Sequence, residues 1–309
     1  MHPYSNNRRA TVAALGEEKL IAAIRRWLGK VSPRSPFGIG DDCAVVPGSG
    51  RSQLVTVDPV IFGRHFDATV PPRAVGAKLL KRNLSDIAAM GGEPRVAVVA
   101  LTLDARTRID WVEGFYRGLA DVARRYRISV VGGDVAQADG TVAASLTLLG
   151  ETTGSRAVTR TGARSGDWIY VTGRLGNTVR TGHHYRFTPR LEEGAWLARQ
   201  RDVRAMMDVS DGLAKDLHAL TPRAATPALE PASLPLRAGA DIRAALSDGE
   251  DYELVFAFAR QGDRAALERA WHRRFPRLPL SCIGRFLPPN ALPAGTLNLQ
   301  DFRGYEHLR

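Results

Sequence analysis

The most constraining feature of this sequence is a set of aspartates, most of them in short clusters with glycine or serine, spread over most of the chain. The set consists of Asp41, Asp42, Asp58, Asp86, Asp134, Asp208 and Asp211. Mg²⁺ takes hard oxygen ligands and commonly bridges a few carboxylates and the phosphates of a substrate. A fold that gathers these distant aspartates would form a pocket for several such cations. The sequence therefore predicts phosphate-transfer chemistry in a pocket built from remote parts of the chain.

The composition is that of a folded protein with a sizeable apolar core. With 309 residues, of which 44% are hydrophobic, the chain is long enough for two domains of ordinary size. No apolar run has the length of a bilayer span, and the first residues lack the apolar stretch of a secretory signal. Cys43 and Cys282 lie far apart and indicate neither a disulfide framework nor a zinc site. We therefore expect a soluble protein of the cytoplasm, with no membrane partner.

The net charge of +11 raises the question of nucleic-acid binding, because phosphate backbones attract clustered Lys and Arg. The excess is mainly arginine, scattered in pairs such as Arg25-Arg26 and Arg124-Arg125 on predicted helix faces. The sequence contains no basic stripe with interleaved aromatic residues, and no zinc-finger or RNP-type motif. Nucleic acid is therefore not an expected partner. The positive charge is expected on a solvated surface, where it can attract anionic substrates.

Hydrophobic periodicity divides the first half of the chain into alternating strands and helices. Apolar residues at helical spacing predict helices, and apolar or β-branched runs bounded by turn residues predict strands. The predicted helices are 17–28, 72–90 and 109–127, and the predicted strands are 53–57, 95–103, 128–131 and 141–149. This order is typical of an α/β or α+β layer domain, which we expect to cover residues 1–150.

The second half, residues 151–309, is expected to form an α+β domain of its own. Its predicted strands are 168–173, 251–259 and 278–286, and its predicted helices are 191–200, 213–220 and 263–275. Residues 174–190 show little periodicity and are expected to form a loop. Residues 221–236 contain four prolines and are expected to form an extended connection.

Three of the first aspartates lie where the predicted elements would expose them to a ligand. Asp42 follows glycines that allow a sharp turn, Asp58 ends a predicted strand, and Asp86 lies in a polar patch of a predicted helix. Each position also has an ordinary explanation, since acidic turns and the solvent side of a helix are common. The small and apolar neighbours of Asp86 favour a functional role for it.

Two downstream motifs place acids beside glycine at the predicted ends of elements. Gly133 and Asp134 follow a predicted strand, so the backbone could approach a phosphate while Asp134 binds a metal; a plain β-turn is the alternative. Asp208 and Asp211 precede a predicted helix, where Asp208 or Ser210 could serve as the N-cap. Two carboxylates at one helix start exceed what capping needs, so metal binding is the favoured interpretation.

His65 and Glu250 are further candidates. His65 is either a substrate contact or a packed loop residue, and Glu250 is one of three acids before a predicted buried strand. Cys43 is not expected to be a nucleophile, because no base motif accompanies it. The sequence has no Walker A loop, no protein-kinase signature and no EF-hand spacing. If ATP is used, its phosphates must be held mainly through metal ions and turn amides.

Taken together and in order, these strings resemble the thiamine-monophosphate kinase family of the PurM-like ATP-binding superfamily. The matching strings are Gly38-Ile39-Gly40-Asp41-Asp42-Cys43-Ala44, Asn83–Gly91, Gly132-Gly133-Asp134, Asp208–Leu213 and Gly249–Leu254. The likeness runs from about Glu17 to Tyr305. Motifs that agree in both content and order indicate a PurM-like two-domain fold.

The resemblance implies direct transfer of the γ-phosphoryl group of ATP to thiamine monophosphate, which gives thiamine diphosphate. It also implies a homodimer that forms through the sheet of the N-terminal domain, and a C-terminal domain that closes over the nucleotide. No general acid or base is implied, because the acceptor phosphate is already largely ionised near neutral pH.

The family's functional residues carry over to this sequence position by position. Several Mg²⁺ ions would be held by Asp42, Thr56, Asp58, Asp86, Asp134, Asp208 and Asp211. The nucleotide would contact Gly133, Asp134, Arg160 and Ser210. Thiamine monophosphate would contact His65, Glu250 and Phe302.

Several departures from the family's pattern concern the acceptor rather than the metal ions. Val57 and Phe62 stand where the family usually has a threonine and a small or acidic residue, and Gln137 lies in an altered segment after Asp134. The segment 173–207 is also shorter than usual. Two alternatives therefore stay open: a PurM-like kinase or synthetase with a different small acceptor, and a catalytically silent homologue that binds nucleotide or nucleic acid.

Overall fold

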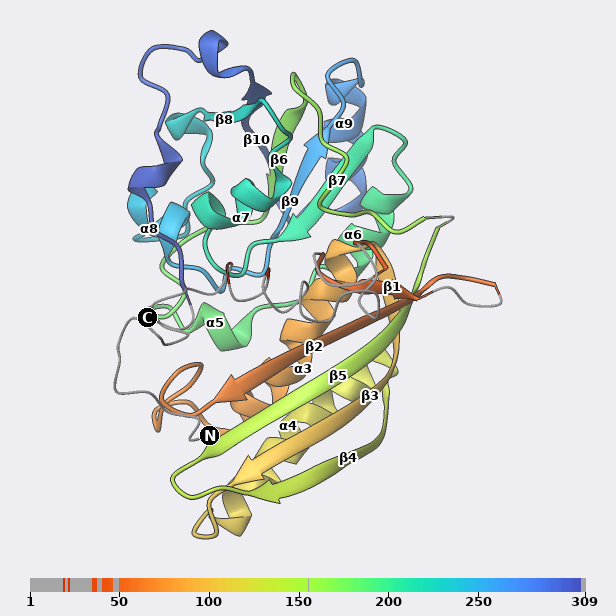
Figure 1. Cartoon of the computed structure of the whole chain (residues 1–309), viewed down its shortest axis with the longest axis vertical. Coiled ribbons are helices and arrows are strands. Elements are labelled where there is room, and N and C mark those ends of the chain that lie inside the picture. Colours follow the sequence, from red (N-terminus) through yellow and green to blue (C-terminus); the bar gives the residue numbers. More distant parts are fainter. Residues whose placement is uncertain are drawn as a thin grey trace.

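The structure is a computed structural model, and it describes Lys19, Ala22 and residues 35–37, 41–46, 50–154 and 156–306. Within these residues, two five-stranded sheets form the two ends of an elongated molecule (Figure 1). No helix in this part of the chain is long and apolar enough to cross a membrane. Apart from Lys19 and Ala22, the helix predicted over 17–28 lies outside the described residues, and so do the glycines before Asp41.

The first sheet is built from the N-terminal half of the chain. Its strands are β1 (Ala44–Val46), β2 (Gln53–Ile61), β3 (Gly92–Leu103), β4 (Ser129–Gln137) and β5 (Val142–Thr152). They lie in the order β1-β2-β5-β3-β4 and are antiparallel except for the pair β3 and β4. Along β5 the side chains alternate between buried and half-buried, which is the period of two expected when one face of a strand is packed.

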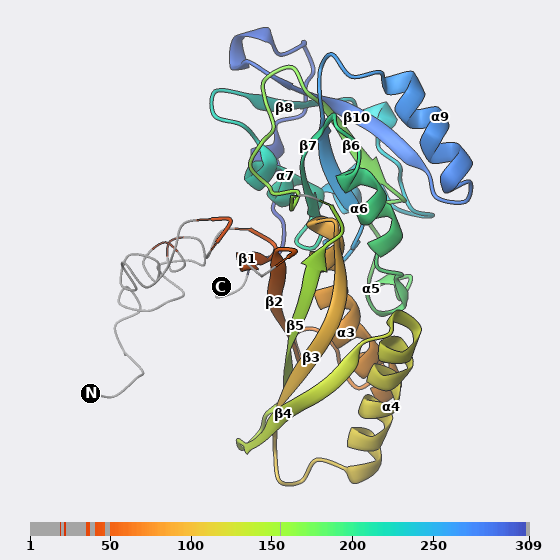
Figure 2. The ribbon, with the colours of Figure 1, turned by 90° about the vertical axis from the view of Figure 1, so that its right-hand side faces the viewer.

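Two helices cover one face of this sheet (Figure 2). α3 (Pro72–Ala89) begins with a proline, whose missing N–H costs no hydrogen bond in a first turn, and it ends just before Gly91 at φ +67°. α4 (Ile109–Tyr126) buries Phe115 and Leu119 in the core. On the opposite face of the sheet, apolar side chains such as Val57 and Val98 are exposed.

α3 and α4 approach each other closely at two glycines. A Cβ atom on Gly76 would lie 1.9 Å from the carbonyl oxygen of Phe115, and one on Gly118 would lie 1.8 Å from the carbonyl oxygen of Arg73. No side chain therefore fits between the two backbones at these positions. This contact sets the position of α3, which carries several residues of the candidate site.

The second sheet is built from the C-terminal half and is antiparallel throughout. Its strands are β6 (Trp168–Thr172), β7 (Val203–Asp208), β8 (Thr226–Leu229), β9 (Leu254–Phe258) and β10 (Leu280–Leu287), in the order β7-β9-β6-β10-β8. The helices of this half are α5 (His183–Arg186), α6 (Leu191–Ala198), α7 (Leu213–Leu220), α8 (Ile242–Ser247) and α9 (Arg264–Arg274). Short 3₁₀ turns occur at Pro231–Ser233, Pro289–Ala291 and Leu299–Asp301.

The two halves share one apolar core that α3 crosses. Leu84 of α3 belongs to the same cluster of buried side chains as Phe256 and Trp271 of the second half. The C-terminal end of α3 lies beside α6 (Figure 1), where a Cβ atom on Gly194 would lie 2.1 Å from the carbonyl oxygen of Ala88. The two halves are therefore held in one arrangement, while the domain boundary at residue 150 stays a prediction.

The α/β character predicted from the sequence is confirmed, and the differences concern single elements. The loop expected over 174–190 contains α5, the connection expected over 221–236 contains β8, and the pattern does not predict β1, β7 or α8. These elements are only three to six residues long, too short for periodicity to identify.

Two predicted strand ends and one predicted helix cap are also wrong, and they concern site residues. β2 and β4 run past Asp58 and Gly133, because pairing with the long strands β5 and β3 continues through an aspartate or a glycine. Asp208 is the last residue of β7 rather than part of a helix start, and the N-cap of α7 is Gly212.

We predict that Gly118→Ala destabilises the protein by about 1–3 kcal/mol, because the added methyl group overpacks the contact between α3 and α4. Urea unfolding followed by circular dichroism measures this loss. Gly114→Ala, on the same helix, is the control, since its added Cβ atom would meet Pro72 and the backbone nitrogen of Arg73 only at 3.0 Å or more. Equal destabilisation by the two substitutions would contradict the close-packing account.

Candidate active site

A cavity between the two sheets collects most of the candidate residues. It has a volume of about 420 Å³ and is bounded by β2, α3, the turn after β7 and the segment before β9. The candidates that line it are Asp42, Thr56, Asp58, His65, Asp86, Arg160, Asp208, Ser210, Asp211 and Glu250. The fold therefore brings side chains from both halves of the chain into one place.

Three carboxylates form the centre of this cavity. One oxygen from each of Asp42, Asp86 and Asp208 lies within 4.8 Å of the other two. Asp42 precedes β1, Asp86 projects from α3, and Asp208 ends β7, so both sheets and one helix set the spacing. Carboxylate oxygens gathered in this way are a suitable donor set for a hard divalent cation.

Hydroxyl groups orient two of these carboxylates. The Oγ1 of Thr56 donates a hydrogen bond to Oδ2 of Asp86 at 2.5 Å, and the Oγ of Ser85 donates to Oδ2 of Asp208 at 2.6 Å. The second of these bonds joins α3 to β7, and both of its residues are buried. It therefore fixes the first half of the site against the second half.

Asp86 and Asp208 are costly to ionise without a cation. Burial, and then the charges of Asp58 and Asp208, raises the pKa of Asp86 well above its usual range. Burial, and then the charge of Asp42, raises the pKa of Asp208 to about 7. A divalent cation would supply the missing positive charge. The chemistry and spacing of these residues therefore fit a bound metal ion such as Mg²⁺.

Basic side chains pair with Asp42 of the centre and with three outer acids of the cavity. Arg160 makes a bidentate ion pair with Asp42, with both N–O distances 2.9 Å. The other pairs are Arg82 with Asp58 at 3.2 Å, Lys215 with Asp211 at 2.7 Å, and Lys78 with Glu250 at 2.5 Å. Lys78 is wholly buried and also donates to the carbonyl oxygen of His65 at 2.7 Å. Cationic side chains are thus built into the walls of an acidic cavity.

Backbone hydrogen bonds hold the two loops that present Ser210 and Glu250. The carboxylate of Asp216 accepts from the N–H groups of Ser210 and Asp211 at 3.0 and 3.1 Å. The N–H of Glu250 donates to the carbonyl oxygen of Ser210 at 2.7 Å. Glu250 and Tyr252 both have positive φ angles, +55° and +50°, a strained conformation that is often found at functional sites. The loops are therefore fixed to each other before any ligand binds.

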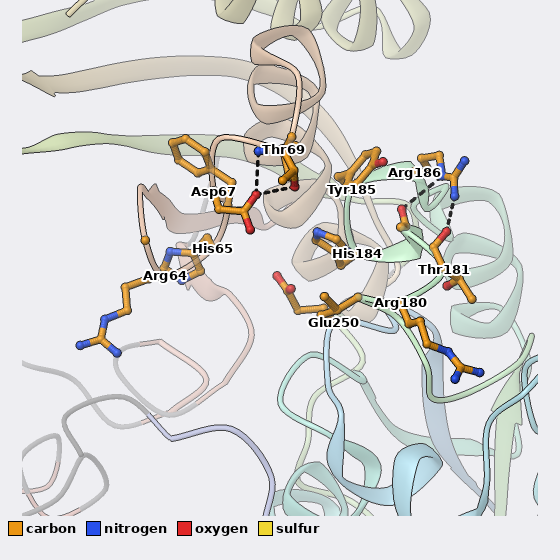
Figure 3. Close-up of a pocket in the computed structure, with 15 residues that line it drawn as sticks. Arg64, His65, Asp67, Thr69, Arg180, Thr181, His184, Tyr185, Arg186 and Glu250 are labelled. Atoms are coloured by element: carbon orange, nitrogen blue, oxygen red, sulfur yellow. Dashed lines mark hydrogen bonds between the residues drawn. The ribbon is translucent and has the colours of Figure 1, made fainter.

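A second cavity of about 390 Å³ adjoins the first, and Arg64, His65, Val179 and Glu250 line both. In Figure 3, Glu250 and His184 face its centre, whereas Arg64 and Arg180 extend away from it. The N–H of Ile61 donates to Nδ1 of His65 at 3.1 Å, so a neutral His65 carries its proton on Nε2. The second cavity therefore offers carboxylate and imidazole groups next to the acidic one.

Three candidates do not line these cavities. Gly133 and Asp134 lie on β4. Strands β3 and β5 lie between β4 and β2, so β4 is three strand spacings, about 14 Å, away from β2. Gly133 is needed for close strand pairing, since a Cβ atom there would lie 1.9 Å from the carbonyl oxygen of Val99. Phe302 packs on the core of the second half with Arg243 over its ring, and Tyr305 lines the cavity instead.

The structure also adds site residues that sequence reasoning did not identify. Arg82, Asp248 and Tyr252 line the acidic cavity, and Lys78 lies behind Glu250. Asp248 and Tyr252 lie close to Glu250 in the sequence. Their position beside this candidate could have identified them as site residues. Arg82 and Lys78 precede Asp86 by one and two helical turns, and that spacing places them on one face of α3.

Comparison with known proteins places the fold in a class. Residues 40–152 match the family model described as AIR synthase related protein, N-terminal domain. The solved structure of HypE in complex with ATP has a TM-score of 0.63 at 18% identity and shares the fold alone. The chain is therefore a PurM-like protein with two α/β halves.

More similar relatives define the family within this class. The thiamine-monophosphate kinase of Rhodopirellula baltica is 36% identical, over 78% of this chain and 82% of its own length. The thiamine-monophosphate kinase of Salmonella typhimurium is 33% identical, over 96% of this chain and 99% of its own length. The solved structure of AaThiL complexed with AMPPCP and TMP has a TM-score of 0.80 at 30% identity and covers 96% of this chain and 98% of its own. The chain belongs to the thiamine-monophosphate kinase family and is an enzyme of that family.

We predict that Asp208→Asn makes the metal-free protein more stable than wild type at pH 8, by at least about 2 °C in melting temperature. The folded-state pKa of Asp208, about 7, lies above its ordinary value of 3.8. Wild type therefore loses stability as the pH rises from about 4 to about 7, and the asparagine variant does not incur this loss. Thermal melts in EDTA at pH 5 and pH 8 measure the difference, which should be smaller at pH 5. A variant that is less stable than wild type at both pH values would contradict this assignment.

Proposed function

We propose that this protein phosphorylates thiamine monophosphate to thiamine diphosphate with ATP as the donor. The observation that carries the proposal is the three-carboxylate centre beside a second cavity, with His65 and Glu250 lining both spaces. The named relatives, and AaThiL complexed with AMPPCP and TMP, support these substrates. The acidic cavity would receive the reacting phosphates, and the second cavity would receive the organic part of the acceptor.

Several Mg²⁺ ions are part of the proposal. The residues that would hold them are Asp42, Thr56, Asp58, Asp86, Asp208 and Asp211, which all line the acidic cavity. Bound Mg²⁺ would screen the repulsion between the donor and acceptor phosphates. ATP would also contact Ser210 and Arg160, and Arg160 is anchored because its N–H donates to the carboxylate of Asp41 at 3.1 Å.

The proposed transfer is a direct in-line displacement. An oxygen of the acceptor phosphate forms a bond to the γ-phosphorus of ATP as the bond from that phosphorus to the β,γ-bridging oxygen breaks, and ADP leaves. The acceptor oxygen is already ionised near neutral pH, so the chain needs no general base at this point. His65 and Glu250, at the junction of the two cavities, would position the acceptor.

Two carboxylates and an aromatic ring of the second cavity can contact thiamine, and Arg64, Arg180 and Arg186 also line it. The carboxylates of Asp67 and Glu250 line it, together with the ring of Tyr185. Carboxylates accept hydrogen bonds from an exocyclic amine and attract a thiazolium cation, and an aromatic ring can lie against either heterocycle. We therefore place the organic part of the acceptor between α5 and the turn that follows β2.

A different small acceptor remains the second candidate function, because Val57 lines the acidic cavity without a hydroxyl group. Incubation of the purified protein with Mg-ATP, with and without thiamine monophosphate, separates the two functions. Turnover to thiamine diphosphate only with that acceptor, abolished by EDTA, supports the first proposal. Metal-dependent nucleotide binding without thiamine diphosphate formation favours the second.

We further propose that the protein is a homodimer that forms through the outer face of the first sheet. Val57, Val98 and Ile61 are exposed apolar residues on β2 and β3, and every residue of the edge strand β4 is exposed. Exposed apolar surface of this kind is typical of interfaces. Within one chain, Asp134 lies apart from the other aspartates, so its predicted role in metal and nucleotide binding, shared with Gly133, requires a second copy.

We predict that Asp211→Asn lowers turnover at least about 100-fold, because one charged group in the phosphate site is lost. Asp211 lines the cavity and pairs with Lys215 at 2.7 Å, and the substitution keeps its shape. The rate of thiamine diphosphate formation measures the effect, and circular dichroism checks the fold. Asp139→Asn, at an exposed turn, is the matched control and should retain wild-type turnover. Wild-type activity in the Asp211 variant would count against the metal assignment.

We predict that Val98→Glu converts the dimer to a monomer, because a buried charge without a partner opposes association. Val98 is 37% exposed on the outer face of β3. Sedimentation velocity measures the state of assembly. Ile109→Glu is the control, since Ile109 is 87% exposed at the start of α4, on the other side of the sheet. An unchanged dimer in the Val98 variant would place the interface elsewhere.

A further inference from the structure

Arg82 is a basic side chain of α3 that lines the acidic cavity. Its side chain is only 10% exposed. Nη1 donates to the carbonyl oxygen of Pro59 at 2.5 Å, and Nη2 donates to Oδ1 of Asp58 at 3.2 Å. The Nε atom is buried and has no hydrogen-bond partner among the described residues. Arg82 thus keeps unused donor capacity at the wall of a ligand cavity.

The surroundings of Arg82 place it between the metal-type acids and the acceptor side of the cavity. Its charge interacts with those of Asp58 and Asp86, which are metal-type acids, and with that of Glu250, which lines both cavities. A guanidinium has five N–H donors in a planar fork, which matches the oxygens of a phosphate. The contact with Pro59 holds one end of the fork, while Nη2 bonds to Asp58, which lines the cavity.

We propose that Arg82 neutralises Asp58 in the metal-free protein and binds a phosphate oxygen of the acceptor once a divalent cation has taken over that carboxylate. This inference rests on the proposed function, because it assigns the acceptor's phosphate to the acidic cavity.

The physical reason is that a divalent cation bound at Oδ1 of Asp58 competes with Nη2 of Arg82 for that oxygen. The bond from Nη2 to Asp58, at 3.2 Å, is long for a charged pair, so a divalent cation at Asp58 displaces it readily. The guanidinium then remains nine-tenths buried without a close anion, which is costly. A phosphate oxygen restores the charge balance and supplies an acceptor for Nε. When the metal binds, Arg82 therefore stops neutralising Asp58 and binds the phosphate instead.

A structural role for Arg82, as a clamp between α3 and β2, is the competing explanation. A clamp predicts that removal of the charge weakens metal binding and phosphate binding together, as the site loosens. The exchange of partners predicts that the two affinities change in opposite directions when the charge is removed. Metal binding becomes tighter, because Arg82 competes with the metal, and phosphate binding becomes weaker, because Arg82 assists it. The two explanations are therefore separated by two binding constants rather than by activity.

The test uses Arg82→Met, which keeps the buried aliphatic stem, and Arg73→Met as the matched control. Arg73 lies on the same helix, pairs with Asp121 and is 66% exposed. Mn²⁺ binding without nucleotide, followed by electron paramagnetic resonance, should be at least about fivefold tighter in the Arg82 variant and unchanged in the control. Unchanged or weaker Mn²⁺ binding in the Arg82 variant would overturn the proposal.

The second measurement is calorimetric titration with inorganic phosphate at saturating Mg²⁺. Arg82→Met should bind phosphate at least about tenfold more weakly than wild type and should raise the KM for thiamine monophosphate by a similar factor. Phosphate affinity equal to that of wild type would overturn the proposal. Both binding measurements are independent of turnover, so an inactive wild-type protein would count against the proposed function and not against the role of Arg82.

Arg82→Lys keeps the test decisive if the methionine variant fails to fold. The ammonium retains the charge, so Mn²⁺ affinity should stay within about twofold of wild type, while loss of the planar fork should weaken phosphate binding. Wild-type phosphate affinity in the lysine variant would contradict the assignment of the guanidinium fork.

Discussion

The structure depends on the cost of gathering ionised carboxylates in one partly buried cavity. Asp42, Asp86 and Asp208 present oxygens within 4.8 Å of one another, and burial raises the pKa of the last two. Such a cluster is tolerated only when positive charge compensates it. The chain supplies part of that charge through Arg160 and Arg82, and it leaves the centre to a divalent cation. A site that is incomplete without metal is well suited to handle phosphates with metal.

α3 is the element through which the fold organises this chemistry. Gly76 and its partner Gly118 seat α3 tightly against α4, and its C-terminal end packs into the core of the second half. From this fixed position it provides Asp86 to the centre of the cavity and Ser85 to the bond with Asp208. One rigid helix therefore sets the spacing between acids that come from the two sheets.

Much of this arrangement could be predicted from the sequence, because long amphipathic elements and acidic turn motifs carry local signals. α3 and α4 match their predicted ranges to within one residue. The ends of β2 and β4, and the strand β7 as a whole, were less predictable, because hydrogen bonds from neighbouring strands extend a strand through residues with little intrinsic preference for one.

The site residues that belong to sequence motifs could be predicted, whereas those that reach the site through tertiary packing could not. The acids of the cavity lie in short polar strings that are visible in the sequence. Arg82 and Lys78 occur in an ordinary amphipathic helix, and only tertiary structure shows that they face acids from other segments. The position of Asp134 on β4, away from the cavity, follows from strand order, which local patterns do not specify.

The central claim is that the clustered carboxylates hold divalent cations that neutralise the phosphates of a nucleotide. The most direct measurement is a crystal structure of the protein with Mn²⁺ and a non-hydrolysable ATP analogue, with anomalous scattering used to locate the metal. We expect anomalous peaks at about 2.1 Å from oxygens of Asp42, Asp86 and Asp208, shared with oxygens of the triphosphate. A nucleotide bound elsewhere, with no metal among these carboxylates, would contradict the account.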